Sequence, residues 1–519
     1  MRNGLALLVS LVFLTACGGG AGGGGGSTSP TGSTIPYGSV SGKAFDGLIL
    51  NGTVSVYDFS TGAKGALLGQ ATTDSTGLYS LSLQVESRPV LLELTGGYYV
   101  EEAGTAGFPT QVALSSGQKL TALDNYTTSG TLSISVTTYT HLAAGLAAYE
   151  IKKGVAVSAA INDANNRVSS LAGINILTTT PKEITDVANA SAFLTPELRY
   201  GFLAGAISMW TYNNTPNLTT NPTPGRVSPY TSIDFAQLLY QDISADGLLD
   251  GIGLDSAGNV TPMSFGTIPL GVNVYRQAIG AAIVQMAGDP NNKTGLTGAQ
   301  VLSFASAYIS NTDAMFNGVP PTTFAPSSVV IFSPSPDAWA RKTVNLTSTA
   351  FSPFGLKTVE LLVDGASVAT SQTLSTQSFP VDTTGHADGQ HTFNVRATDL
   401  GGFVTTASVQ LKIDNTPPTS TGGFTPLPFP PMTYGPVPVF GTASDNYSGV
   451  SSVTASISPS GTLPISAGTN WSTSVPPTDN FSAIQYQIND AAGNCSIYKF
   501  VLPTSSSPLA VWTLVNTCS

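Results

Sequence analysis

The residues between Asp242 and Asp255 have the spacing in this chain that best suits a metal ion. Gly247 allows a sharp backbone turn in the middle of the stretch. The groups that could surround an ion all offer an oxygen atom, and they belong to Asp242, Ser244, Asp246, Leu248, Asp250 and Asp255. Leu248 would contribute its backbone carbonyl, and the others would contribute side chains. Hard oxygen ligands of this kind suit Ca²⁺, so the stretch predicts a calcium loop.

The order of these residues resembles the first part of an EF-hand-type calcium loop. The twelfth position departs from that pattern, because Gly253 stands where a bidentate Glu is expected. Asp255, two residues later, could replace that ligand. The alternative is an Asp- and Gly-rich helix exit that only caps and turns. Asp399, Asp414 and Asp445 are weaker calcium candidates, for which we expect turn roles.

Signatures of catalysis are missing from the sequence. It has three histidines: His141 suits a helix core or cap, while His386 and His391 flank a turn. There is no Gly-x-Ser-x-Gly elbow, His-Glu-x-x-His pair, phosphate-binding glycine loop or Cys-x-x-Cys-His haem site. We therefore assign no catalytic residue and expect no enzyme activity.

A carbohydrate-active hydrolase remains an alternative, because two catalytic carboxylates need not be adjacent in sequence. In that case the helical region would be catalytic, and Trp210, Tyr212 and Tyr230 could line a cleft.

The first of three cysteines, Cys17, ends a signal-like segment. Arg2 is followed by an apolar run from Leu5 to Leu14 that is too short to span a bilayer as a helix. The Leu14-Thr15-Ala16-Cys17 sequence resembles a bacterial lipobox. The resemblance implies that residues 1–16 are removed and that Cys17 carries the covalent lipid that anchors the protein. The alternative is an ordinary secretory signal with an incidental cysteine.

Composition fits an exported protein. Only 9% of the residues are charged, and the net charge of -11 argues against nucleic acid as a partner. Residues 17–36, rich in Gly and Ser, predict a flexible tether. Gly18 is not the Asp that commonly retains lipoproteins in an inner membrane, so we expect the outer membrane or the cell surface. In an oxidising compartment Cys495 and Cys518 are expected to form a disulfide.

Residues 37–137 predict a β-sandwich. Short runs such as 53–57, 78–83 and 90–94 favour strands, and Gly, Asp and Asn separate them. The segment resembles the carboxypeptidase regulatory-like, transthyretin-like family, which is usually an accessory module. The likeness rests on Gly42, Gly52, Val54, Val56, Thr73, Asp74, Gly77, Tyr79 and Leu81. We expect Asp74 to form a turn, and a metal-ligand role is the alternative.

In residues 138–317 the spacing of the apolar residues changes to that of an α-helix. Leu142, Leu146 and Tyr149 share one helix face, and the next helix repeats the spacing before Gly173. Thr195-Pro196-Glu197 is a typical helix start. Further helices are predicted over 232–240, 272–287 and 297–310. This part is therefore expected to be all-α.

Strand patterns return after a Pro-rich linker, residues 318–326. Asp364-Gly365 predicts a hairpin turn. Residues 327–415 and 416–519 resemble two bacterial immunoglobulin-like (Ig-like) repeats. The first copy rests on Gly389, Phe393, Val395, Ala397, Asp399 and Gly402, and the second on Asp490, Gly493 and Asn494, with Trp471 in its core.

The predicted fold class is multidomain: a β-sandwich, an all-α domain and two Ig-like β-sandwiches. These accessory folds predict a membrane-anchored extracytoplasmic lipoprotein that acts in binding, adhesion or scaffolding at the cell surface. A surface polysaccharide or a protein would be its ligand. A purely structural stalk is the other alternative.

Overall fold

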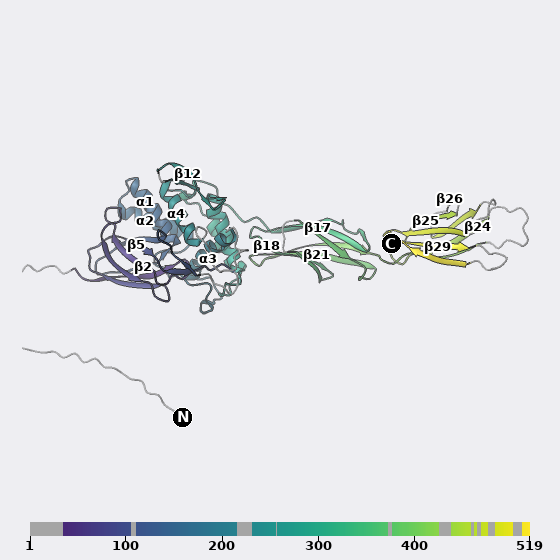
Figure 1. The fold of residues 1–519 in the computed structure, drawn as a ribbon, viewed down its shortest axis with the longest axis horizontal. Coiled ribbons are helices and arrows are strands. Elements are labelled where there is room, and N and C mark those ends of the chain that lie inside the picture. Colours follow the sequence, from purple (N-terminus) through teal and green to yellow (C-terminus); the bar gives the residue numbers. More distant parts are fainter. Residues whose placement is uncertain are drawn as a thin grey trace, which may run out of the picture.

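The computed structural model describes residues 35–104, 111–214, 231–255, 257–371, 376–424, 437–457, 461–463, 465, 469–475, 483–501 and 511–518. They form three bodies in single file (Figure 1). The head (residues 38–316) is followed by the first Ig-like sandwich (328–413) and then by the second (419–517). The multidomain fold class is confirmed. Residues 1–34, and with them the predicted signal segment, Cys17 and most of the tether, lie outside the described residues.

The head begins with two β-sheets packed face to face. One sheet has the order β10-β1-β4, with β9 also paired to β1, and the other has the order β3-β2-β5-β8. Their bounds are β1 (Gly38–Phe45), β2 (Thr53–Asp58), β3 (Leu67–Thr72), β4 (Leu78–Leu83), β5 (Arg88–Thr95), β8 (Lys119–Tyr126), β9 (Thr131–Ser133) and β10 (Val136–Thr137). Two further strands, β6 (Tyr98–Val100) and β7 (Gln111–Ala113), form a separate pair. Residues 90–94 of β5 are all buried, because one face of the strand contacts the sandwich core and the other contacts helices.

The turn before β4 is held by Asp74. Its Oδ1 atom accepts hydrogen bonds from the backbone N–H groups of Thr76 and Leu78, and Gly77 adopts a φ of 73°. Tyr79 then enters the core and donates a hydrogen bond to the Ile134 carbonyl. The predicted turn role of Asp74 is confirmed.

The helical part of the head contains every helix that the sequence predicts. The bounds are α1 (Thr138–Lys152), α2 (Val157–Ala172), α3 (Pro196–Asn214), α4 (Ser232–Asp246), α5 (Ile279–Ala287) and α6 (Gly298–Ile309). Shorter turns are η1 (Val187–Asn189), η2 (Asn273–Ala278) and η3 (Ala314–Phe316), and the hairpin strands are β11 (Ile252–Leu254), β12 (Val260–Pro262), β13 (Ser264–Phe265) and β14 (Ile268–Pro269). Within the described residues, no helix combines the length and apolar character that a membrane crossing requires.

Helix α1 is more deeply buried than its pattern predicts. A capping box between Thr137 and Thr140 starts the helix, and its first ten residues are all buried. The helix packs against β8, α2 and α4. Small residues permit this approach: a Cβ atom on Gly145 would lie 2.7 Å from Ile243 Cγ2. The sandwich and the helices therefore share apolar contacts, and Leu91 and Leu123 of the sheet belong to the helical core.

Three carboxyl groups are buried between the sandwich and the helices of the head. Asp46, Glu101 and Glu102 are each 1% exposed. Glu101 accepts hydrogen bonds from the Ser232 backbone N–H and the Ser208 hydroxyl, whereas neither carboxyl oxygen of Glu102 has a hydrogen-bond partner. Burial raises the pKa of Glu102 well above its usual range, and the nearby Asp46 and Glu101 carboxyls raise it further. This environment favours the neutral acid form of Glu102.

The head joins the first Ig-like sandwich through apolar and backbone contacts. The ring of Phe354 packs edge-on against Phe324 and stacks on Phe403, with centroid distances of 4.8 Å and 5.5 Å. Gln285 of α5 donates a hydrogen bond of 2.8 Å to the Phe354 carbonyl. The buried Arg276 also donates to the carbonyls of Asn311, Val319 and Pro320. The two Ig-like sandwiches together are called the arm. These contacts hold the linker and the head-proximal end of the arm against the helices.

The first Ig-like sandwich has sheets of the order β15-β17-β20 and β16-β22-β21-β18-β19. Its strands are β15 (Ser328–Ser333), β16 (Trp339–Ala340), β17 (Thr343–Phe351), β18 (Leu356–Val363), β19 (Ala366–Ser371), β20 (Thr376–Asp382), β21 (Gly389–Asp399) and β22 (Val404–Ile413). Asp364 and Gly365 adopt φ values of 49° and 85° in the turn between β18 and β19. This left-handed pair confirms the predicted hairpin.

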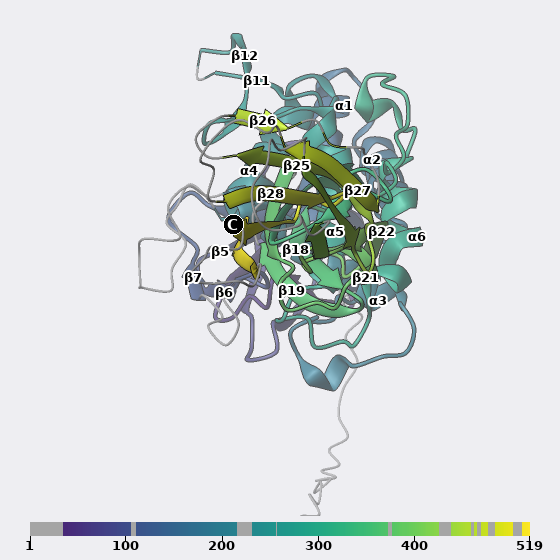
Figure 2. The same ribbon diagram turned by 90° about the vertical axis from the view of Figure 1, so that its right-hand side faces the viewer.

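The second Ig-like sandwich has sheets of the order β23-β24-β27 and β26-β25-β28-β29-β30. Its strands are β23 (Thr419–Phe424), β24 (Val437–Ser444), β25 (Val450–Ile457), β26 (Gly461–Leu463), β27 (Asn470–Val475), β28 (Ala483–Asp490), β29 (Cys495–Val501) and β30 (Val511–Thr517). Figure 2 views the molecule from this end of the arm. Trp471 is 1% exposed, which confirms its predicted core position.

Candidate functional site

A shallow groove lies on the three-stranded sheet of the second Ig-like sandwich. Strand alternation turns Val439 and Trp471 into the core and leaves Phe440, Thr442 and Ser472 exposed. The groove encloses about 430 Å³. Its lining is uncharged and consists of Thr421, Gly422, Phe440, Gly441, Thr442, Asn470, Trp471 and Ser472.

The register of the sheet lines up the polar side chains of the groove. Thr442 pairs with Thr421 on one side and with Asn470 on the other, so these three form one cross-strand row. Phe440 pairs with Ser472 in the next row. Phe440 is 48% exposed. The surface thus offers hydroxyl and amide hydrogen bonds beside an apolar ring face.

Two glycines allow the groove to form above aromatic core residues. A Cβ atom on Gly441 would lie 2.5 Å from Trp471 Cζ2, and one on Gly422 would lie 2.3 Å from Trp512 Cζ2. The indole rings therefore pack directly against the sheet backbone. Trp471 Nε1 is buried without a hydrogen-bond partner.

The predicted calcium loop is partly helical. Helix α4 continues six residues beyond the predicted end at Tyr240, because its hydrogen bonding runs on to Asp246 and Gly247 ends it with a φ of 84°. Asp242, Ser244 and Asp246 thus lie on a helix and not on a wrapped loop. The predicted helix end is wrong because Gly247, and not the preceding acidic stretch, stops the helix.

Backbone donors occupy the carboxylates of this stretch. Asp242 accepts from Gly251 and Ile252, and Asp250 also accepts from Ile252. Asp246 accepts from the Leu248 N–H, and Asp255 accepts from Asn259. Burial raises the pKa of Asp242 to about 7. The groups of metal-ligating side chains that lie within binding distance in the described residues do not include these acids. Calcium binding here stays a prediction.

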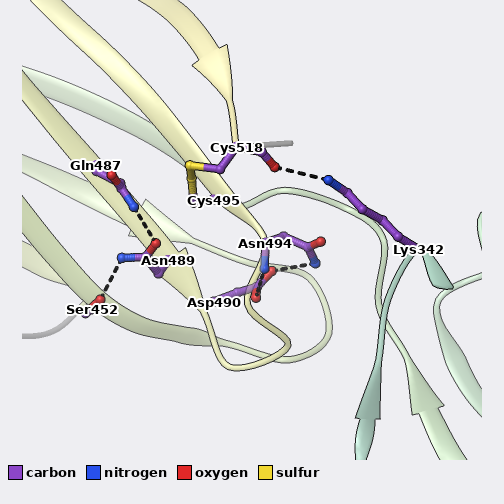
Figure 3. Close-up of a disulfide and its surroundings, with 8 residues drawn as sticks. All are labelled: Lys342, Ser452, Gln487, Asn489, Asp490, Asn494, Cys495 and Cys518. Carbon is purple, nitrogen blue, oxygen red and sulfur yellow. Dashed lines mark hydrogen bonds between the residues drawn. A yellow bond between two sulfur atoms is a disulfide. The ribbon is translucent and has the colours of Figure 1, made fainter. Parts of the chain in front are cut away.

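Cys495 and Cys518 are joined in a disulfide, with their Cα atoms 5.1 Å apart (Figure 3). The bond connects the start of β29 to the residue after β30. The backbone N–H of Cys518 also donates to the Cys495 carbonyl. Both cysteines lie beside the junction with the first Ig-like sandwich, where Lys342 Nζ donates to the Cys518 carbonyl at 3.4 Å.

The histidines occupy structural positions. His141 is 1% exposed, its Nδ1 atom lies 2.7 Å from Thr121 Oγ1, and its ring stacks on Tyr240. Burial lowers its pKa to about 3, so it is a neutral core residue, as predicted. His391 contacts Asp364 Oδ2 and the Ala387 carbonyl through its two ring nitrogens. His386 packs against the His391 ring at a centroid distance of 5.5 Å.

Two of the three aromatic residues considered for a sugar cleft in the head pack in its helical core. Trp210 is 6% exposed and packs against Phe235 and Phe265 at 4.8 Å and 5.2 Å. Tyr212 packs against the same helical core, and Tyr230 lies outside the described residues. Trp210 is therefore a core residue.

Comparison with known proteins identifies the first arm segment. Residues 328–395 match the family model described as a bacterial Ig domain. No curated protein matches the chain. The Ig-like character predicted for this segment is thus confirmed.

Solved structures with similarity to the chain come from several sources. The Clostridium thermocellum CbhA fibronectin(III)-like modules are 15% identical, with 36% of this chain and 91% of theirs covered and a TM-score of 0.21. Bovine butyrophilin is 12% identical, with 35% and 100% covered and a TM-score of 0.21. The endo-beta-1,4-mannanase from Thermotoga petrophila is 15% identical, with 23% and 24% covered and a TM-score of 0.16.

Proposed function

We propose that the protein is a lipid-anchored extracytoplasmic lipoprotein that binds a ligand at the cell surface, in adhesion or as a scaffold. The observation that carries this proposal is the order of the parts. Cys17 and the tether precede the head, whereas the sandwich with the groove lies at the other end of the molecule (Figure 1). With the lipid in an outer membrane or at the cell surface, the arm would hold the groove away from the bilayer.

The head fits the role of a base in this proposal. Its sandwich resembles the carboxypeptidase regulatory-like family, which is usually an accessory module. The helices fill one face of that sandwich, and the apolar junction at Phe354 joins them to the arm. A base that is packed so closely against the arm would transmit its orientation to the sandwich at the far end.

A neutral polysaccharide is the ligand class that the groove favours. Its lining has no charged side chain, and Thr421, Thr442 and Asn470 offer donors and acceptors in one row. Sugar hydroxyl groups can pair with such a row while an apolar sugar face covers the ring of Phe440. A protein ligand is the other outcome that the experiment below can return.

The full chain should be tested on an array of surface glycans and matrix proteins. We expect binding to neutral glycans, weakened at least tenfold by Phe440→Ala. The matched control is Phe351→Ala, because Phe351 is also 48% exposed but lies on the first Ig-like sandwich. Unchanged glycan binding in Phe440→Ala would contradict the proposal that the groove is the binding site. If the protein binds no glycan and no protein on the array, the result would contradict a binding role and support the alternative of a purely structural stalk.

A further inference from the structure

Three carboxylates meet where the two Ig-like sandwiches join. Asp414 follows β22 of the first sandwich, Asp445 lies between β24 and β25, and Asp490 ends β28 of the second. One oxygen atom from each carboxylate lies within 4.8 Å of the other two. Asp414 is 0% exposed and Asp490 is 2% exposed. Residues from both sandwiches thus create one negative site that is mostly shielded from water.

Neutral groups donate the hydrogen bonds that Asp414 and Asp490 accept at this site, and the Arg341 guanidinium lies nearby against Gly493. Thr416 and Ser448 donate their backbone N–H groups to Asp414, and Asn494 donates its backbone and side-chain N–H groups to Asp490. Within the described part of the chain, none of the three carboxylates forms an ion pair with a basic side chain. Figure 3 shows Lys342 directed instead to the Cys518 carbonyl.

This arrangement is costly without a counter-charge. Buried charges in proteins are normally paired or bound to metal ions. Asp414 and Asp490 are both buried and close together, so their like charges would repel each other where little water can screen them. A divalent cation would remove both the repulsion and the desolvation cost.

A second observation comes from Asp445. Its Oδ1 atom accepts hydrogen bonds from the backbone N–H groups of Tyr447 and Gly449, which form the turn. Its Oδ2 atom is shielded from solvent and has no hydrogen-bond partner. A buried acceptor without a donor is costly, and more so when it is charged. The turn already has its hydrogen bonds, so the free oxygen is left for a ligand outside the protein.

We propose that Asp414, Asp445 and Asp490 bind a calcium ion that connects the two Ig-like sandwiches. Calcium binds six to eight oxygen atoms at about 2.3–2.6 Å, so two ligands of one ion can lie about 4.8 Å apart. Magnesium requires a tighter octahedron and keeps more of its water. Backbone carbonyls and water would complete the calcium shell. The proposal does not depend on the lipid anchor or on the groove.

The ion has a definite mechanical consequence. The head and the first Ig-like sandwich are joined by packed phenyl rings. The two Ig-like sandwiches meet through a ring contact between Trp339 and Tyr447, with centroids 5.3 Å apart, and through polar contacts such as the bond from Asn494 Nδ2 to the Asp414 carbonyl. Calcium would hold Asp414 of one sandwich to Asp445 and Asp490 of the other. The direction of the last sandwich would then be set in calcium-rich surroundings and released by a chelator.

Calorimetric titration of the full chain with Ca²⁺ tests this site. We expect binding in the range of about 10⁻⁴ to 10⁻³ M, as in extracellular calcium modules, and weaker binding of Mg²⁺. Asp445→Asn should weaken calcium binding at least tenfold while keeping the Oδ1 acceptor of the turn. The matched control is Asp382→Asn, which alters an exposed turn of the first sandwich and should leave the affinity unchanged.

Hydrogen exchange gives a second readout of the same site. Calcium should slow the exchange of the Thr416 and Ser448 amides in the wild type and not in Asp445→Asn. Absence of calcium binding by the wild type, or equal affinity in Asp445→Asn, would overturn the proposal. Loss of calcium binding in Asp246→Asn with normal binding in Asp445→Asn would show that the ion binds at helix α4. That result would also overturn the proposal.

Discussion

Replacing both Cys495 and Cys518 by serine is expected to destabilise the second Ig-like sandwich by about 3 kcal/mol. The disulfide closes a loop between residues 23 positions apart, and a loop of that length restricts the unfolded chain by about this amount. We also expect the disulfide to hold strand β30 in the sheet. It is an edge strand, and Val511, Leu514 and Val515 on it are about half exposed.

Chemical denaturation followed by hydrogen exchange across β28–β30 measures this effect separately from the rest of the chain. The reduced wild type should match the double serine variant, which controls for the substitutions themselves. In the unreduced protein, neither cysteine should react with an alkylating reagent. Free labelling of both thiols, or equal stability with and without reductant, would contradict the role of the disulfide.

Glu102→Gln is expected to make the head more stable at neutral pH. The folded state raises the pKa of Glu102 above its ordinary value near 4.5, so the folded protein binds a proton that the unfolded chain releases. Stability from this group is complete below that ordinary value and is lost as the pH rises towards the folded pKa. The loss approaches about 1.4 kcal/mol per pH unit. A neutral glutamine does not titrate and can donate to neighbouring carboxyl oxygens.

The difference in unfolding free energy between Glu102→Gln and wild type should therefore grow from pH 5 to pH 8. Taking the difference removes contributions of other groups, such as His141, whose lowered pKa acts in the opposite direction. Glu86→Gln, at an exposed carboxyl, is the matched control. A difference that does not change with pH would show that Glu102 is not held as a neutral acid.

Local patterns in the sequence predict the elements of this fold well. The Gly173 end of α2, the Pro196 helix start and the Asp364-Gly365 turn each depend on residues within a few positions of one another. The predicted end of α4 is wrong for a related reason. The residues Asp242 to Gly247 fit both a loop and a helix with a glycine cap, and the backbone hydrogen bonding of α4 shows that the helix continues to Asp246.

Tertiary contacts determine what the sequence could not predict. Helix α1 has an ordinary apolar face, and its burial on all sides follows from the positions of β8, α2 and α4. Asp414 and Asp490 lie far apart in sequence, so their meeting depends on how two sandwiches join. The groove depends on the register that places Thr421, Thr442 and Asn470 in one row, which residue types alone do not specify.

Fractionation of cells that express the wild type or Cys17→Ser tests the central claim, the lipid anchor at the head end, most directly. We expect the wild type in the membrane fraction, because two or three acyl chains hold a protein firmly in a bilayer. Cys17→Ser should move nearly all of the protein to the soluble extracytoplasmic fraction with its fold unchanged. Equal membrane association of Cys17→Ser and the wild type would contradict lipid anchoring at Cys17. It would also remove the basis for proposing that the arm points away from the membrane.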